Sequence, residues 1–244
     1  GGIGANILDS IIEYDPVIDN LIIKSVTLPS ANFGLSCAEN SDTHKVYCFG
    51  GTDNIGNSNQ TLEYDPATDI LIIKNATLPT RRRGLACSQN PFTNKIYCFG
   101  GLADGGTTDQ IIEYDSIADL LTIRPVTLPS PRHYPSCSFT NKFYCFGGEG
   151  LSALSQIVRY DQGFTPDLFP IGNQQVNENE TLTINLQAID PNNDPLIFGT
   201  NAASVLPSSF TFTQTSNTTA LFQWTPTFSN QGNYQVTFNV TDGT

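Results

Sequence analysis

The heptad KVYCFGG at residues 45–51 returns as KIYCFGG at 95–101 and as KFYCFGG at 142–148. The flanking sequence repeats as well, because IIEYDPVIDNLIIKSVTLPS (11–30) aligns without gaps with residues 61–80 and 111–130. The chain therefore carries an internal repeat with a period of 50 residues. A repeat of this length is built from one small unit of secondary structure, so it decides the architecture of the segment that contains it.

Each period predicts four short strands. Two apolar and aromatic segments, such as GLSCAE and KVYCFGG, are followed by QTLEYD and ILIIKNATL, with an Asp-Pro-x-x-Asp turn signal between the last two. No segment has a sustained helical period. The glycine pair predicts a sharp bend or positive φ, and the Tyr and Phe of each heptad are expected to fill space between neighbouring units. Short strands in such a repeat are typical of propeller blades.

These residues resemble the kelch repeat, which has a Tyr-x-Phe-Gly-Gly strand end, a Glu-Tyr-Asp strand and a Leu-Pro-x-x-Arg segment. Arg82 and Arg132 fill the arginine position, whereas Asn32 fills it in the first copy. The Trp that kelch repeats often carry is replaced by leucine. The resemblance covers residues 1–161 and implies kelch-type propeller blades, about three in number, that form a partial or open propeller. The run Arg81–Arg83 is the densest positive patch and is expected to be solvated.

The six cysteines form three local pairs, each with one cysteine on each of two successive predicted strands. In the third copy the intervening segment is three residues shorter, yet both cysteines remain. Six cysteines allow 15 connectivities, and the repetition favours the pairing within each blade. Zinc is the alternative, although no Cys-x-x-Cys spacing is present. Disulfides indicate an oxidising, extracellular location. The predicted pairs are Cys37–Cys48, Cys87–Cys98 and Cys137–Cys145.

The composition changes near residue 161. The net charge is −12, yet all 11 Lys and Arg residues lie before Gln162. We therefore expect a first domain at 1–161, a linker at 162–169 and a second domain at 170–244. The acidic balance argues against nucleic acid as a partner, and no apolar run reaches the length of a membrane span.

The second domain is expected to be a β-sandwich, since ETLTINLQAID and NYQVTFNVTDG alternate with period two. The segment LFQWTPTFSNQGNYQVTFNVTDG resembles the last strands of bacterial and archaeal immunoglobulin-like and dystroglycan-type cadherin-like domains. The resemblance implies a sandwich of roughly seven strands. Trp224 is assigned to its core.

Cadherin-like modules hold calcium with loop carboxylates, and Asp190, Asn192 and Asp194 occupy the matching loop. Their oxygen ligands suit a hard cation, so calcium is the one cofactor that the sequence offers. A solvated Asx turn is the alternative interpretation. Sequons for N-glycosylation form a second class of candidate sites, and the loop around the first of them is expected to be exposed. They are Asn59, Asn75, Asn179, Asn217 and Asn239.

No catalytic motif is present, and the two histidines occupy non-equivalent positions of the repeat. The sequence favours a non-enzymatic extracellular protein for adhesion or for assembly of a surface structure such as a filament, with other proteins or its own copies as partners. A carbohydrate-binding module, with glycans as the ligand, and a fragment of a secreted kelch-type enzyme remain the alternatives.

The copies do not add up to a closed ring. The first copy supplies only the two outer strands, within residues 7–28, and the last copy supplies three strands before residue 161. Either the chain is a segment of a longer protein, or neighbouring chains complete one another by strand addition. In the second case, strands from residues 1–30 of one copy would pair beside residues 156–161 of the next.

Overall fold

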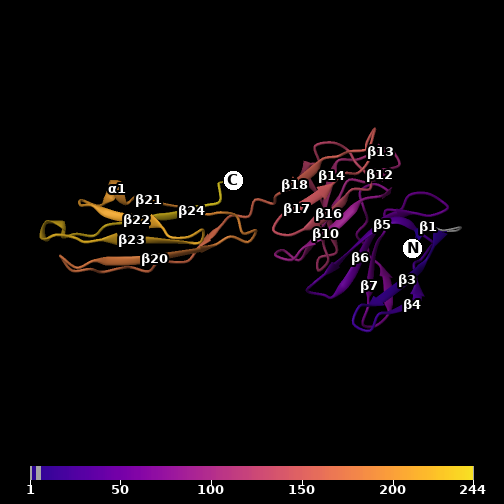
Figure 1. Cartoon of the computed structure of the whole chain (residues 1–244), viewed down its shortest axis with the longest axis horizontal. Coiled ribbons are helices and arrows are strands. Elements are labelled where there is room, and N and C mark those ends of the chain that lie inside the picture. Colours follow the sequence, from indigo (N-terminus) through magenta and orange to yellow (C-terminus); the bar gives the residue numbers. More distant parts are fainter. Residues whose placement is uncertain (1, 4–6, 244) are drawn as a thin grey trace. The chain divides into compact units, whose positions relative to one another are not determined.

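The computed structural model describes residues 2–3 and 7–243, so the predicted domain ends Gly1 and Thr244 lie outside the described residues, as do residues 4–6. The chain divides into two compact units, Gly1–Asp161 and Gln162–Thr244. Within the described ranges the only helical elements are α1 (Ala202–Val205) and the 3-10 turn η1 (Phe228–Asn230). The predicted all-β class is thereby confirmed (Figure 1).

The first unit is a series of antiparallel sheets whose strands pair in chain order (Figure 1). The strands β10 and β16 lie beside one another, and β10 also lies beside β5, so the first strands of three sheets are neighbours. The main sheets are β3 (Ser10–Asp15) with β4 (Asn20–Thr27); β5 (Phe33–Asn40), β6 (Lys45–Thr52), β7 (Thr61–Asp65) and β8 (Ile70–Ile73); β10 (Ala86–Asn90), β11 (Lys95–Phe99), β14 (Gln110–Asp115) and β15 (Leu120–Thr127); and β16 (Ser136–Phe139), β17 (Phe143–Phe146) and β18 (Ile157–Tyr160).

The first unit also contains two small sheets. They are β1 (Gly2–Ile3) with β2 (Ile7–Leu8), and β9 (Arg82–Arg83), β12 (Leu102–Ala103) and β13 (Gly106–Thr107). The four main sheets therefore have two, four, four and three described strands. This series fits the expected succession of blades, while membership of the kelch family stays a prediction.

The Asp-Pro-x-x-Asp motif and its variant Asp-Ser-x-x-Asp explain the hairpin that closes each of the first three main sheets. In the third sheet, Asp115 Oδ1 accepts hydrogen bonds from the backbone N–H groups of Ile117 and Ala118, at 3.0 Å each. Asp119 has a φ of +49° and accepts the hydroxyl of Tyr114 at 3.0 Å. An aspartate that accepts hydrogen bonds from the backbone two residues ahead favours a tight turn, so the motif itself sets the connection.

The glycine pair at the end of each heptad adopts the predicted positive φ. Gly100 and Gly101 have φ of +65° and +110°, a region that residues with a Cβ rarely adopt. A Cβ atom on Gly100 would lie 2.2 Å from the backbone oxygen of Arg132. The same oxygen accepts the N–H of Gly101 at 2.8 Å. The pair is thus required because the next segment of backbone passes directly over the end of the strand.

The arginine position is an internal anchor, so the expectation of a solvated patch at Arg81–Arg83 is wrong for its central member. Arg82 is fully buried. Its guanidinium donates to Gln110 Oε1 at 2.6 Å and to the backbone oxygen of Gly100 at 3.3 Å. Burial lowers the pKa of Arg82 to about 10. Arg132 is also fully buried and bonds Gly147 and Gln156 in the same way.

Disulfide bonds join the cysteines within each sheet. Each pair occupies directly opposed positions on the first two strands of its sheet. The separation along the chain is 11, 11 and 8 residues, so the bond tolerates the shorter loop of the last copy. The pairs are Cys37–Cys48, Cys87–Cys98 and Cys137–Cys145.

The second unit has two sheets that share one core. The aromatic side chains Phe198 of one sheet and Phe222 and Trp224 of the other belong to the same buried cluster. Trp224 lies in this core, as the sequence indicated, and its Nε1 donates to Ser208 Oγ at 2.8 Å. The sheets are β19 (Asp167–Leu168), β20 (Leu182–Ile189), β23 (Thr219–Trp224) and β22 (Phe210–Gln214), and β21 (Ile197–Thr200) with β24 (Phe238–Thr241).

Two expectations for this unit need correction. Asp167 and Leu168, assigned to a linker at 162–169, form β19, which pairs with Ile189 and Ala188 of β20. The reason is that Leu168 packs against the core of the sandwich. The described residues of the unit also form six strands, not about seven.

Candidate protein-binding surface

Successive sheets of the first unit pack through one recurring aromatic contact. Tyr47 and Phe49 of β6 meet Tyr114 of the following four-stranded sheet, with ring centroids 5.5 and 5.3 Å apart. The contact is repeated one sheet later by the rings of Tyr97, Phe99 and Tyr160, at 6.2 and 5.9 Å. Each intact sheet therefore covers the third strand of the next sheet with the Tyr and Phe of its repeated heptad.

The first sheet lacks such a cover among the described residues. Ile12 and Tyr14 of β3 are 57% and 56% exposed, whereas Ile112 and Tyr114, one hundred residues later in the repeat, are 1% and 0% exposed. Leu21, opposite Tyr14 on β4, is also exposed, although its counterpart Leu121 packs against the core. We call Ile12, Tyr14 and Leu21 the first-sheet face.

In the last sheet, the uncovered surface is the one that carries the Tyr and Phe of the repeated heptad. Phe146 of β17 is 48% exposed, whereas the equivalent Phe49 and Phe99 are fully buried. Ile157 lies opposite Phe146 on β18 and is 65% exposed, against 1% for Ile111. Tyr144, on the same side of β17, is half-buried. We call Tyr144, Phe146 and Ile157 the last-sheet face.

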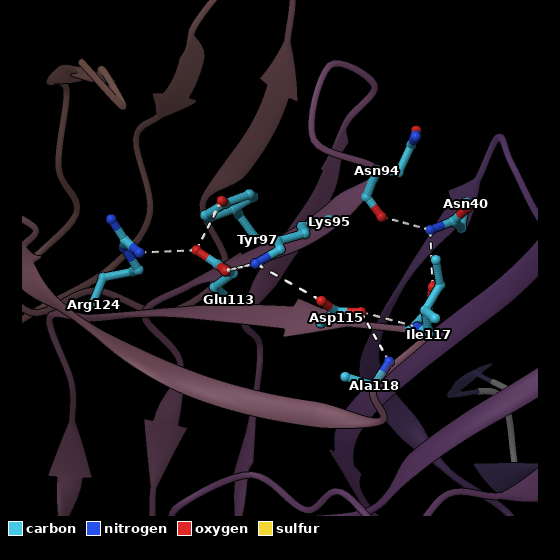
Figure 2. Close-up of polar contacts among 10 residues, drawn as sticks. Asn40, Asn94, Lys95, Tyr97, Glu113, Asp115, Ile117, Ala118 and Arg124 are labelled. Carbon is cyan, nitrogen blue, oxygen red and sulfur yellow. Dashed lines mark hydrogen bonds and ion pairs between the residues drawn. The ribbon is translucent and has the colours of Figure 1, made fainter. Parts of the chain in front are cut away.

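A buried carboxylate holds the outer strands of each intact sheet together (Figure 2). Glu113 accepts from Lys95 Nζ at 2.6 Å, Arg124 Nη1 at 3.0 Å and the Tyr97 hydroxyl at 2.9 Å. Burial alone would raise the pKa of Glu113, but these hydrogen bonds and the two cations outweigh it and hold the pKa below its usual range. Since Glu63 is paired with Lys45 and Lys74 in the same manner, the cluster is a structural feature of the repeat.

A polar contact also joins neighbouring sheets. Asn40, at the end of β5, is 1% exposed. Its Nδ2 donates to the backbone oxygen of Asn94 at 2.7 Å (Figure 2). It also donates to Ser116 Oγ at 3.0 Å, and both acceptors lie in turns of the next sheet. Aromatic packing thus fixes the centre of the contact between the second and third main sheets, and the buried amide of Asn40 fixes its margin.

The candidate calcium loop folds as an Asx turn that contains a buried carboxylate oxygen. Asp190 Oδ1 accepts the N–H groups of Asn192 and Asp194 at 3.1 and 2.9 Å. Asn192 Nδ2 donates to Asp194 Oδ2 at 2.9 Å, so the structure brings the three residues together. The other carboxylate oxygen, Asp190 Oδ2, is buried without a hydrogen-bond partner. Over the described ranges, however, no group of three or more His, Cys, Asp and Glu is arranged to hold a metal.

The sequons differ in accessibility. Asn59 is half-buried, contrary to the expectation of an exposed loop. The reason is that its segment is hydrogen-bonded on both sides, since Asn59 O accepts the N–H of Leu78 and Ser58 O accepts that of Arg82. The exposed members of the set are Asn75, Asn179, Asn217 and Asn239.

A groove of about 450 Å³ runs along the first strands of the second, third and fourth sheets. Among its lining residues Phe139 is the one aromatic ring and Glu39 the one charged side chain. Sugars are bound mainly by aromatic platforms together with convergent polar groups. The groove therefore gives little support for a glycan site.

Comparison with known proteins gives a match for the second unit only. Residues 167–244 match the family model of the bacterial Ig domain. The match begins at β19, in agreement with the corrected start of the sandwich. A search of curated protein sequences finds no match to the chain. In the described part of the chain, no helix has the length and apolar character needed to cross a bilayer.

Proposed function

We propose that the chain is a non-enzymatic extracellular protein that serves adhesion or the assembly of a surface structure through protein–protein contacts. The observation that carries the proposal is the pair of uncovered apolar faces, whose repeat equivalents are buried. Contiguous exposed apolar surface rimmed by polar residues marks protein-binding sites. Three disulfides support an oxidising compartment, and the bacterial Ig domain match supports a module for contacts at the cell surface.

The proposal is tested by probing the purified, oxidised chain on two arrays, one of secreted and surface proteins and one of glycans. We expect saturable binding to protein spots, which include the chain itself, and lower binding by a variant with Ile12→Glu and Ile157→Glu. Saturable binding confined to glycans would overturn the proposal in favour of a carbohydrate-binding module. The Ile117→Glu variant is the control, because Ile117 is 83% exposed and belongs to neither face.

We further propose that the loop of Asp190, Asn192 and Asp194 takes up calcium, with the buried Asp190 Oδ2 as the supporting feature. Trp224 is the only Trp and lies in the core of this unit, so its fluorescence reports on this unit alone. At a calcium concentration tenfold above the dissociation constant, the unit should gain about 1.4 kcal/mol in free energy of unfolding. The measurement is denaturant unfolding followed by Trp224 emission, in calcium and in chelator.

Asp190→Asn should abolish the gain, while Glu178→Gln, an exposed acid of the same unit, should preserve it. Identical unfolding curves in calcium and chelator would leave the Asx turn as the sole role of the loop.

A further inference from the structure

We propose that the last-sheet face of one copy binds the first-sheet face of the next, so that copies associate head to tail. This inference rests on the proposed function and names the partner as a second copy of the chain. Its basis is the packing between sheets within one chain, which supplies both halves of the contact.

The two faces carry the residues that meet in that packing. Tyr144 and Phe146 stand where Tyr47 and Phe49, and again Tyr97 and Phe99, stand in the earlier heptads. Their ring partner is the tyrosine of the third strand in the next sheet, which is Tyr114 in one case and Tyr160 in the other. Tyr14 is the equivalent tyrosine of the first sheet, and it is exposed. A head-to-tail contact thus forms a third example of packing that the chain already makes twice.

The charges at the two faces complement each other as well. Arg159, exposed on β18 opposite Tyr144, stands where the intact sheets carry Glu63 and Glu113. The turn beside the first-sheet face carries Asp19, which accepts the hydroxyl of Tyr14 at 2.7 Å. Its equivalent Asp119 accepts a donor from the preceding sheet, the N–H of Asn75, at 3.0 Å. The last-sheet face thus carries a cation where the intact sheets carry a glutamate, and the turn beside the first-sheet face carries an acid, so the two faces have opposite charges.

The contact is between unlike faces, and that has a consequence for assembly. A heterologous contact leaves one unused face at each end of a pair, so further copies add until the series closes into a ring or extends as a filament. It also differs from addition of a strand at the edge of β18, because it uses side chains on the surfaces of the sheets and not their edges.

The test is sedimentation of the full, oxidised chain over a range of concentrations, alone and in mixtures. The native chain should form species larger than a dimer. Ile12→Glu and Ile157→Glu should each weaken association at least about tenfold, because each buries an unpaired carboxylate in an apolar contact. Mixing the two variants should give one-to-one dimers that do not grow, since each variant retains one intact face. Ile117→Glu should behave like the native chain, and unchanged circular dichroism shows that the variants are folded.

Several outcomes overturn the inference. A chain that stays monomeric at all concentrations would do so, and binding to other proteins on the array would then leave the proposed function standing. Oligomers that resist both substitutions would point to pairing at the strand edges. Dimers of Ile12→Glu alone that equal those of the mixture would indicate contact between like faces.

Discussion

Replacing Tyr114 by alanine should lower the free energy of unfolding of the first unit by about 3–5 kcal/mol, the usual cost of deleting a fully buried aromatic side chain. Tyr114 is 0% exposed and packs against the rings of Tyr47 and Phe49 across the contact between two sheets. The substitution therefore opens a cavity in the interface that holds successive sheets together. Denaturant unfolding followed by circular dichroism measures the loss, while Trp224 emission monitors the second unit in the same sample.

The repeat provides a matched control at the same position of the first sheet. Tyr14 is 56% exposed and its hydroxyl binds Asp19 as that of Tyr114 binds Asp119. Tyr14→Ala should cost the monomer only about 0.5 kcal/mol, the range of surface substitutions. Measured below the concentration of association, equal losses for the two variants would contradict the assignment of Tyr14 to an uncovered face. Tyr114→Phe, which removes only a hydrogen bond, should cost about 1 kcal/mol.

The sequence predicts most local structure of the first unit because each local motif occurs in three copies. A cysteine on each of two neighbouring strands, a turn between two aspartates and a glycine pair recur at fixed spacing, so chance resemblance is excluded by repetition. The deletion of three residues in the last copy was the most informative difference, since it separated the variable loop from the retained cysteines. Opposed positions such as Cys137 and Cys145 followed from this comparison.

The features that escaped prediction are those set by packing between segments. In the sequence, Arg82 is one of three consecutive arginines, which suggests an exposed position. In the structure, the segment that carries Arg82 crosses the glycine pair Gly50–Gly51, and the arginine side chain is fully buried. Asn59 lies in a polar stretch that suggests a loose loop. However, its backbone oxygen accepts the N–H of Leu78, and the N–H of the preceding Ser58 donates to the backbone oxygen of Gly51. Leu168 looks like part of a linker until the core that it covers is known. In each case polarity along the chain gives no information about which segment lies opposite.

The two uncovered faces could be predicted from the sequence only in part. Comparison of the copies indicates which residues are buried in the intact sheets, and the exposed fractions of Ile12 and Tyr14 show where such burial is absent from the described residues. The sequence offers two explanations, a longer protein or completion by strands at an edge near residues 156–161. The exposure of Phe146 and Ile157 adds a different surface, the flat side of the last sheet, which becomes evident because their counterparts Phe99 and Ile111 are buried in the structure.

Glu113→Gln should lower the free energy of unfolding of the first unit by about 2 kcal/mol. Exposed ion pairs contribute less than this, and breaking a fully buried pair costs about 3–5 kcal/mol. An intermediate value is expected because the side chains of Lys95 and Arg124 are each 34% exposed. The substitution leaves two cations beside a neutral amide. Glu13→Gln is the matched control, since the side chain of Glu13 is 49% exposed and pairs with Lys24 as its one cation among the described residues. That variant should lose no more than about 0.5 kcal/mol.

The same carboxylate predicts how stability depends on pH. Its pKa is lowered in the folded state, because hydrogen bonds and cations outweigh the opposing effect of burial. The unfolded chain therefore binds the proton more tightly, and the contribution of Glu113 is fully present above the ordinary glutamate pKa of about 4.3 and is lost as pH falls through the folded value. Glu63 has a lowered pKa for the same reason and adds to the effect. The native first unit should lose stability steeply on acidification from about pH 5, and Glu113→Gln should flatten the profile. A variant whose unfolding midpoint falls with pH as steeply as that of the native chain would show that Glu113 is not held in its charged form by Lys95 and Arg124.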